Sequence, residues 1–408
     1  MLEIQRMQFK DQAGAEALAL PFLRDATHMD ILQVELRPLA VSLNSFNGFI
    51  HLQDGKKYFF KTHIESDNVI DEFYNASLLA EAHYPVVKPI FSSTESGRQL
   101  LVYEVIDAPS VFDVAWDIEQ GNTQQLATLT KAQNEADQLL FRIYEETLQG
   151  ISPEVNTKAP IHQLFYHRLT GGRLERFYGE GQSIQFPDVL LPMSRVKQLR
   201  WTINGQVYQK TFGDLIQQAI DMLNPYQSVM SVVGHGDAHN GNVFLTEMPD
   251  ARLLYFDPAF AGRHHPLLDL TKPLFHNVFA MWMYFPQIKN DLTPVGYHLE
   301  GDQIHVQYDY HLPQVRIMFL ESKVDHCLKP LLHILKRQNA LPENWRMFLK
   351  SALFCCPSLT MNLTDSVKFP PKISLLGLAM AVEMGGESSG QKSQIDQILD
   401  DVENSLRS

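Results

Sequence analysis

The stretch that decides the fold is Val232–Phe244, which reads VVGHGDAHNGNVF. Two apolar, β-prone runs flank a polar loop that carries His235, Asp237 and Asn242. Loops that follow a strand are places where binding and catalytic residues concentrate. This loop is therefore the first candidate for a functional site, and Asp237 is its only carboxylate.

A second carboxylate follows the next apolar run, where LLYFDPAFAG places Asp257 directly after a predicted strand. Asn242 and Asp257 together offer the oxygen ligands that Mg²⁺ takes, because that ion uses one or two carboxylates and completes its shell with water and phosphate. Asp237 would then remain to accept a proton from an attacking hydroxyl. This division of roles predicts phosphoryl transfer.

The first hundred residues are predicted to form mostly strands. Asp54–Gly55 is a strong two-residue hairpin signal between two of them. Apolar residues at three- and four-residue steps predict one helix after the third strand. The expected order is three strands, one helix and two strands, over 31–42, 48–53, 57–63, 68–82, 86–93 and 99–106.

From Asp107 onward the pattern is mainly helical, apart from a short strand pair over 243–247 and 252–257. Asn122 or Thr123 is expected to begin a long helix, and 212–224 is amphipathic. The composition of 385–394, GGESSGQKSQ, predicts a flexible link to an acidic tail. The last segment carries an apolar stripe that could dock on the protein or mediate association.

These elements predict an α+β, bilobal fold. Residues 1–106 would form an N-lobe with a small antiparallel sheet and one helix, and 107–384 a larger, mainly helical C-lobe. Residues 385–408 would form a flexible polar tail. Ligands prefer the crevice between two such lobes.

The N-lobe supplies candidates for phosphate binding. Lys61 ends the run KYFFK, and Glu72 lies on the following predicted helix. A lysine on a strand reaches nucleotide phosphates when a carboxylate holds its flexible side chain. Taken alone, the two residues are typical of a solvated surface pair. In chain order with the Asp–Asn–Asp set, they are interpreted as nucleotide-binding residues.

HGDAHNGNV, followed by YFDPAFAG, resembles the catalytic and metal-binding segments of the aminoglycoside phosphotransferase family, which has the protein-kinase-like fold. The resemblance extends in order from about Leu36 to Leu270, and Asp269 matches a later Asp of the family. It implies that Asp237 is the catalytic base and that His235 braces the loop.

The resemblance further implies that Asn242 and Asp257 bind Mg²⁺ and that Lys61, held by Glu72, contacts the phosphates of ATP. Backbone groups around Glu104 and Ile106 would meet the adenine. The loop SLNSFNGF lacks the glycines of a protein-kinase phosphate loop, but a polar turn can still offer N–H groups to phosphate. By their position, Ser45, Asn47 and Gly48 are its candidate phosphate-binding residues.

We therefore expect an ATP-dependent kinase that phosphorylates a hydroxyl of a small molecule, with ATP and Mg²⁺ as cofactors. The run DPAFAGRHHPLLDL also resembles fructosamine kinases, which points to a sugar-like acceptor. The alternatives are a protein kinase, an AMP-transferring enzyme on the same fold, a non-catalytic pseudokinase that binds nucleotide, and an α+β scaffold protein with an accidental motif.

The segment HRLTGGRLERFYG gathers Arg168, Arg173 and Arg176 around two glycines. Arginine is well suited to phosphate or carboxylate, so an anionic substrate site is one interpretation. The preferred interpretation is a turn with ordinary surface arginines.

The formal net charge of −13 argues against a broad footprint for nucleic acid. The chain starts without the charged and apolar regions of a signal peptide, and its longest late apolar run is too short for a membrane span. Three cysteines give no disulfide framework. We expect a cytoplasmic protein without a nucleic-acid or membrane partner, and the sequence leaves its oligomeric state open.

Overall fold

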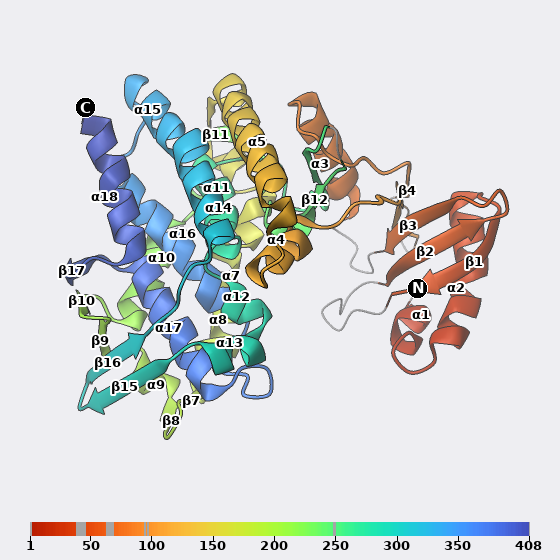
Figure 1. Ribbon diagram of the computed structural model, residues 1–408. Coiled ribbons are helices and arrows are strands. Elements are labelled where there is room, and N and C mark those ends of the chain that lie inside the picture. Colours follow the sequence, from red (N-terminus) through yellow and green to blue (C-terminus); the bar gives the residue numbers. More distant parts are fainter. Residues whose placement is uncertain are drawn as a thin grey trace.

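The chain folds into two lobes of different construction (Figure 1). The computed structural model describes residues 2–37, 46–62, 69–93, 95, 98–247 and 250–407. The N-lobe is built on an antiparallel sheet, and the C-lobe is mainly helical. A helix joins the third and fourth strands of the sheet, and the loop of Asp237 lies in the helical lobe. The predicted α+β, bilobal fold, with a small antiparallel-sheet lobe and a larger, mainly helical lobe, is confirmed.

The N-lobe sheet has five strands in the order β1-β2-β3-β5-β4. The predicted order of three strands, one helix and two strands is confirmed. The elements are β1 (Ile31–Leu36), β2 (Asn47–Leu52), β3 (Lys57–Thr62), α3 (Val69–Glu81), β4 (Phe91–Ser93) and β5 (Leu100–Glu104). At the predicted hairpin turn, Gly55 has a φ of 85° and Lys56 donates its N–H to Asp54 Oδ1 at 3.0 Å.

Two helices precede the sheet and differ from the mostly strand-like start that the sequence predicts. They are α1 (Leu2–Met7) and α2 (Gln12–Thr27). Ala15, Ala19 and Leu23 recur every four residues along α2 and are fully buried in one cluster with the sheet residues Ile50 and Phe60. The small alanines allow α2 to lie close against the sheet, so packing and not strand propensity decides this segment.

The C-lobe contains one continuous hydrophobic core. The predicted long helix begins at Leu126 after a 3₁₀ turn that Asn122 caps, and the amphipathic helix is capped by Thr211 and Asp214. The main helices are α4 (Val111–Glu119), α5 (Leu126–Thr147), α7 (Tyr166–Thr170), α10 (Phe212–Met222), α11 (Pro266–His276), α14 (Gln314–Lys323), α15 (Lys329–Arg337), α16 (Trp345–Leu359) and α17 (Pro371–Gly385). Among the helices described, none is both long and apolar enough to cross a membrane.

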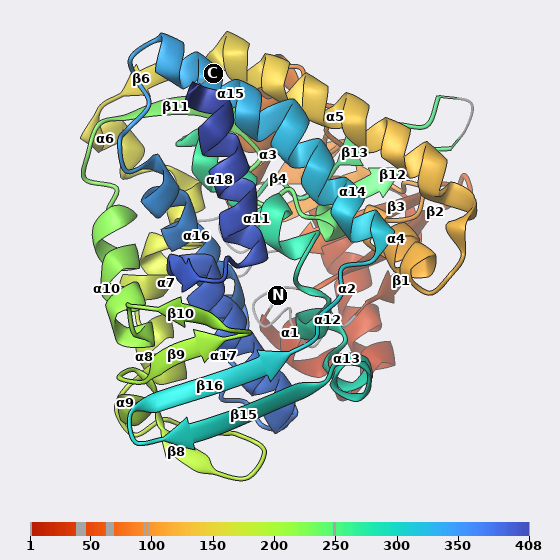
Figure 2. The ribbon, with the colours of Figure 1, turned by 60° about the vertical axis from the view of Figure 1, so that its left-hand side comes forward.

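A second five-stranded sheet covers one end of the C-lobe, in a region predicted to be mostly helical (Figure 2). Side chains of the hairpin formed by the first two of these strands alternate between exposed and more buried positions, which is the period of a strand. The third strand comes from far upstream and runs parallel to the second. The order is β15 (Val295–Glu300), β16 (Gln303–Tyr308), β9 (Arg200–Ile203), β10 (Gln206–Tyr208) and β17 (Ser388–Gly390).

The end of the chain is packed, so the prediction of a flexible tail over 385–408 is wrong. β17 pairs with β10, and α18 (Gln394–Arg407) follows it. The apolar stripe of α18 docks on the protein, with Ile395, Leu399 and Val402 almost fully buried. Asp396, which is fully buried, forms an ion pair with Lys350 of α16. The partners of this polar segment lie elsewhere in the chain and are invisible in its composition.

Replacing Asp396 with Ala is expected to lower the free energy of unfolding by about 3–5 kcal/mol, because it leaves the Lys350 ammonium buried without its partner. The same substitution at exposed Asp401 should change it by less than about 0.5 kcal/mol. Urea denaturation of the full chain measures both, and equal effects would contradict the role of the buried pair.

Lowering the pH should also remove the stability that the Asp396–Lys350 ion pair contributes. Burial alone would raise the pKa of Asp396, but Lys350 and the hydrogen bonds from Ser388 outweigh burial and lower it to about 2. The folded-state pKa is thus below the unfolded value of about 3.9, so the stabilisation is complete above that value and declines as the pH falls towards 2. We expect the stability difference between wild type and Asp396→Ala to shrink over this range.

Candidate active site

A strand and a hairpin carry the candidate residues to one place. β11 (Val229–Gly234) leads into the loop of Asp237 and Asn242, and the antiparallel hairpin of β12 (Val243–Leu245) and β13 (Leu253–Tyr255) leads to Asp257. At the open end of this hairpin, Phe256 donates its N–H to the carbonyl of Asn242 at 2.9 Å. The register therefore sets Asn242 and Asp257 side by side, as a shared metal site requires.

The same hairpin is fixed to the N-lobe. Tyr255 donates its N–H to Pro85 O at 2.8 Å, and Val87 donates to Tyr255 O at 2.9 Å. The ring of Phe256 packs edge-on against Tyr103 of β5, with 5.2 Å between ring centroids. Backbone hydrogen bonds and an aromatic contact thus hold the segment before Asp257 against the lobe that carries Lys61.

Lys61 and Asp257 meet where the two lobes join. Lys61 lies on β3 opposite Asn47, and its Nζ lies 2.7 Å from Asp257 Oδ1. Asp257 has a φ of 56°, a left-handed conformation that is uncommon for a residue other than glycine. Such strained residues cluster at functional sites, where the surrounding structure holds them in place.

Asp237 presents a carboxylate oxygen without a partner. Its Oδ1 atom is buried and has no hydrogen-bond partner among the described residues. Gly236, with a φ of 81°, turns the chain just before it, and a Cβ on this glycine would lie 2.4 Å from Phe260 O. Asn242 Nδ2 donates to Asp237 O at 3.0 Å, which leaves the amide oxygen of Asn242 available to a ligand.

Neighbouring cations keep Asp237 ionised. Burial by itself would raise the pKa of this carboxyl group, but the charge of Lys272, the ring of His239 and the charge of Arg168 outweigh burial and lower its pKa. Lys272 Nζ lies 3.9 Å from Asp237 Oδ1, too far for a hydrogen bond. Asp237 Oδ1, which accepts no hydrogen bond from the described residues, is therefore a charged hydrogen-bond acceptor at neutral pH.

His235 braces the loop, as the sequence predicts. Its ring is fully buried, and Nε2 donates to Phe256 O at 3.0 Å, while Nδ1 accepts the Asp237 N–H at 3.4 Å. One nitrogen donates and the other accepts, so the ring is neutral. Burial, the main cause, lowers the pKa of His235 in agreement with this form.

Asp269 supports the loop from beneath. One of its oxygens accepts the Gly236 N–H at 2.5 Å and lies 3.1 Å from His264 Nε2 of β14 (Gly262–His264), and the other accepts a hydrogen bond from Tyr144 of α5. Burial alone would raise the pKa of Asp269, but these hydrogen bonds outweigh burial and lower it. The carboxylate thus joins α11, β14 and α5 to the turn that positions Asp237.

Of the other predicted site residues, some have side chains outside the part of the chain that the structure describes and the rest lie on β2 or at or just beyond the end of β5. Ser45 and the side chain of Glu72 lie outside the described residues. Asn47 and Gly48 begin β2, where a Cβ on Gly48 would lie 2.1 Å from Glu35 O. Glu104 ends β5 with an exposed side chain and, with Ile106, belongs to the connector that leads to α4.

Sequence reasoning assigned no role to Lys272 and interpreted Arg168 as a surface residue. Lys272 is 3% exposed and lies on α11, whose residues are all buried. A lone lysine in the apolar run LLDLTKPLF was the available signal. Buried Nε and Nη1 atoms show that the surface interpretation is wrong for Arg168. The guanidinium groups of Arg173 and Arg176 instead lie over the ring of Phe177, at 5.9 and 5.6 Å from its centroid.

The donor set fits a hard divalent cation. Asn242 offers one amide oxygen and Asp257 one carboxylate, and Mg²⁺ takes the rest of its shell from water and phosphate. Within the described ranges, no group of three or more His, Cys, Asp or Glu side chains is arranged to hold a metal. Asn242 and Asp257 would therefore hold Mg²⁺ only together with the phosphates of a bound nucleotide.

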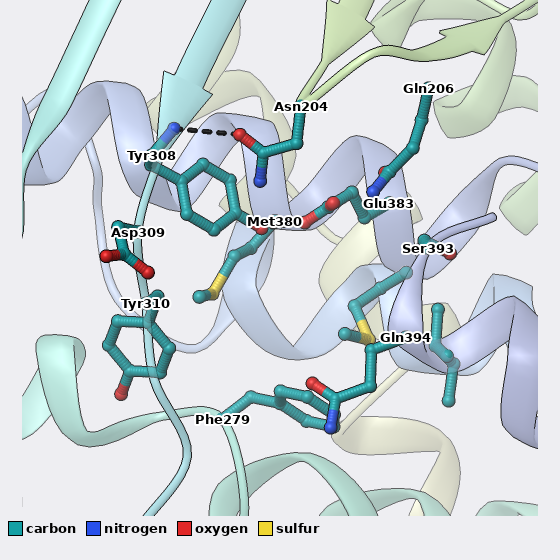
Figure 3. A pocket seen from close by; sticks show the side chains of 12 residues that line it. Asn204, Gln206, Phe279, Tyr308, Asp309, Tyr310, Met380, Glu383, Ser393 and Gln394 are labelled. Carbon is teal, nitrogen blue, oxygen red and sulfur yellow. Dashed lines mark hydrogen bonds between the residues drawn. The ribbon is translucent and has the colours of Figure 1, made fainter. Parts of the chain in front are cut away.

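A polar cavity of about 190 Å³ lies elsewhere in the C-lobe, between β16, α17 and α18 (Figure 3). Tyr308 donates its hydroxyl hydrogen to Glu383 and its N–H to Asn204 Oδ1 at 2.9 Å. Burial raises the pKa of Glu383 to about 7. The lining contains none of the predicted site residues, so this cavity is not part of the candidate active site.

Replacing Asp269 with Ala should lower the free energy of unfolding by on the order of 3 kcal/mol, because several buried donors lose their acceptor. Asp269→Asn keeps the size and one acceptor oxygen and should cost less. Amide hydrogen exchange of residues 234–242 should accelerate in the alanine variant. Unchanged exchange in this loop would contradict the supporting role of the carboxylate.

Comparisons with known proteins give likenesses in structure only. No family model and no curated protein matches the sequence. A solved amicoumacin kinase with AMP-PNP and Ca²⁺ has a TM-score of 0.49 and 14% identity over 94% of this chain and 96% of its own. A spectinomycin phosphotransferase with ADP and spectinomycin gives 0.41 and 13%, over 90% and 98%.

A candidate fructosamine-3-kinase from Thermobifida fusca YX-ER1 gives a TM-score of 0.42 and 13% identity, over 90% of this chain and 98% of its own. These proteins carry the names of small-molecule kinases, the kind of protein that the loop sequence resembles. The chain is thus similar to small-molecule kinases over most of its length, at low sequence identity.

Proposed function

We propose that the protein is an ATP-dependent phosphotransferase that moves the γ-phosphoryl group to a hydroxyl of a small, sugar-like molecule. The observation that carries this proposal is the ionised Oδ1 atom of Asp237, which accepts no hydrogen bond from the described residues. Asn242 and the Lys61–Asp257 pair accompany it in the candidate site. A base, a metal-ligand pair and a phosphate-binding cation are the parts that phosphoryl transfer requires.

The chain's own groups act mainly by position and charge. Asp237 Oδ1 orients the acceptor hydroxyl and takes its proton as the new O–P bond forms. Its lowered pKa makes it a weak base, so proton transfer comes late in the reaction. Lys61 contacts phosphate oxygens from the N-lobe, and its pairing with Asp257 fixes its direction. Mg²⁺ held by Asn242 and Asp257 would neutralise negative charge on the phosphates.

Nucleotide binding is tested by thermal unfolding with ATP, GTP and Mg²⁺, present or absent. A ligand that binds the folded state raises the melting temperature. We expect a rise that needs both nucleotide and Mg²⁺ and that Asp257→Asn reduces, because the substitution removes a charged metal ligand. No rise with any nucleotide in the wild type would contradict the proposed function.

Replacing Asp237 with Asn should reduce turnover by about 10²–10⁴-fold while nucleotide binding is retained, because the amide cannot accept the proton. The same substitution at exposed Asp188 serves as the control. Mass spectrometry of candidate acceptors after incubation with ATP detects the product. A gain of one phosphoryl group supports the proposal, whereas gain of AMP, or phosphate on protein substrates alone, would assign a different reaction.

A further inference from the structure

We propose that Arg168 and Lys272 form an anion-binding pair beside Asp237, which receives a phosphate or carboxylate group carried by the acceptor. This inference rests on the proposed function, whose acceptor it narrows to an anionic molecule with a free hydroxyl. It concerns two residues that the sequence pattern did not assign to catalysis.

The first feature that supports an anion-binding pair is the guanidinium group of Arg168. Its Nε and Nη1 atoms are buried, and neither finds a hydrogen-bond partner in the part of the chain that the structure describes. Buried donors in folded proteins are almost always paired, so unpaired ones call for an explanation. Arginine carries its donors in a planar fork that matches the oxygens of phosphate and carboxylate.

Lys272 brings a second cation to the same place. Its ammonium lies 3.9 Å from Asp237 Oδ1 and 3.3 Å from His276 Nε2, and the residue is 3% exposed. Burial lowers the pKa of Lys272, Asp237 opposes this effect, and Arg168 reinforces it. An anion beside these two groups would favour the charged form of the lysine and relieve the repulsion between them.

The surrounding groups leave an excess of positive charge. Asp237 is the carboxylate whose pKa both cations lower, whereas Asp257 is paired with Lys61. His239 and His276 border the same space, with 5.8 Å between their ring centroids. Burial lowers the pKa of both rings, which favours their neutral forms. One ionised carboxylate thus faces two cations.

The place of the pair favours the acceptor over the nucleotide. Lys61 reaches the phosphates of ATP from the N-lobe, and Asn242 and Asp257 supply the metal ligands. Arg168 and Lys272 belong to α7 and α11 of the C-lobe and act on Asp237, the residue assigned to the acceptor hydroxyl. An anionic group bound there would hold a nearby hydroxyl against Asp237.

The test is calorimetric titration of inorganic phosphate into the full chain saturated with AMP-PNP and Mg²⁺. Because the nucleotide supplies its own γ-phosphate, phosphate that still binds must occupy the acceptor side. We expect binding by the wild type and at least tenfold weaker binding by Arg168→Gln and by Lys272→Gln. Arg176→Gln, an exposed arginine of the same segment, should bind like the wild type.

No side-chain hydrogen bond joins Arg168 to the described residues, so the melting temperature of Arg168→Gln without ligand should equal or exceed that of the wild type. A marked fall in melting temperature, with phosphate binding intact, would assign Arg168 a structural role and overturn the proposal. Phosphate that binds only the nucleotide-free protein and is displaced by AMP-PNP would assign the pair to the donor phosphate. No phosphate binding in either state would also overturn it.

Failure of the proposed function gives a different result. If AMP-PNP does not bind at all, phosphoryl transfer from ATP is contradicted. Phosphate binding to the free protein that Arg168→Gln abolishes would still support the anion site. If AMP-PNP binds and the paired cations do not bind phosphate, the kinase proposal stands and the anionic acceptor does not.

Discussion

The candidate site depends on the hydrogen bonds that the buried carboxylate of Asp269 makes. A charged group in a protein interior is costly unless hydrogen bonds and opposite charges compensate for lost water. Here the compensation comes from the Gly236 N–H, the His264 ring and the Tyr144 hydroxyl, which belong to separate parts of the C-lobe. Because these groups must all meet Asp269, they fix the sharp turn that aims Asp237. The geometry of the loop is thus set by a residue outside it.

A second constraint joins the two lobes. β13 shares backbone hydrogen bonds with the segment around Pro85, and Phe256 packs against the aromatic ring of Tyr103. These contacts hold Asp257 near Lys61 without relying on the ion pair itself. Partly exposed ion pairs contribute little to stability. Such a pair is better suited to bind phosphate and metal than to hold the lobes together.

The charged groups around Asp237 differ from those around Asp269 in how far their hydrogen bonds are satisfied. The hydrogen bonds of Asp269 are satisfied, whereas Asp237 Oδ1 and two nitrogen atoms of Arg168 have no partner among the described residues. Unsatisfied buried groups reduce stability, and their presence together at one place is typical of a site that a ligand completes. The difference between these two buried aspartates separates a supporting residue from the proposed catalytic base.

The sequence by itself determined the succession of strands and helix from residue 31 onward in the N-lobe, the hairpin at Asp54–Gly55 and the position of the polar loop. Alternation, turn residues and flanking apolar runs are local properties. It could not identify the burial of Lys272 and Arg168 or the partner of Asp396, because the segments that surround these residues lie far away along the chain. For the same reason it missed the sheet that pairs β16 with β9 and the docking of α18. Only the tertiary structure decided these features, since burial and pairing depend on which distant segments meet.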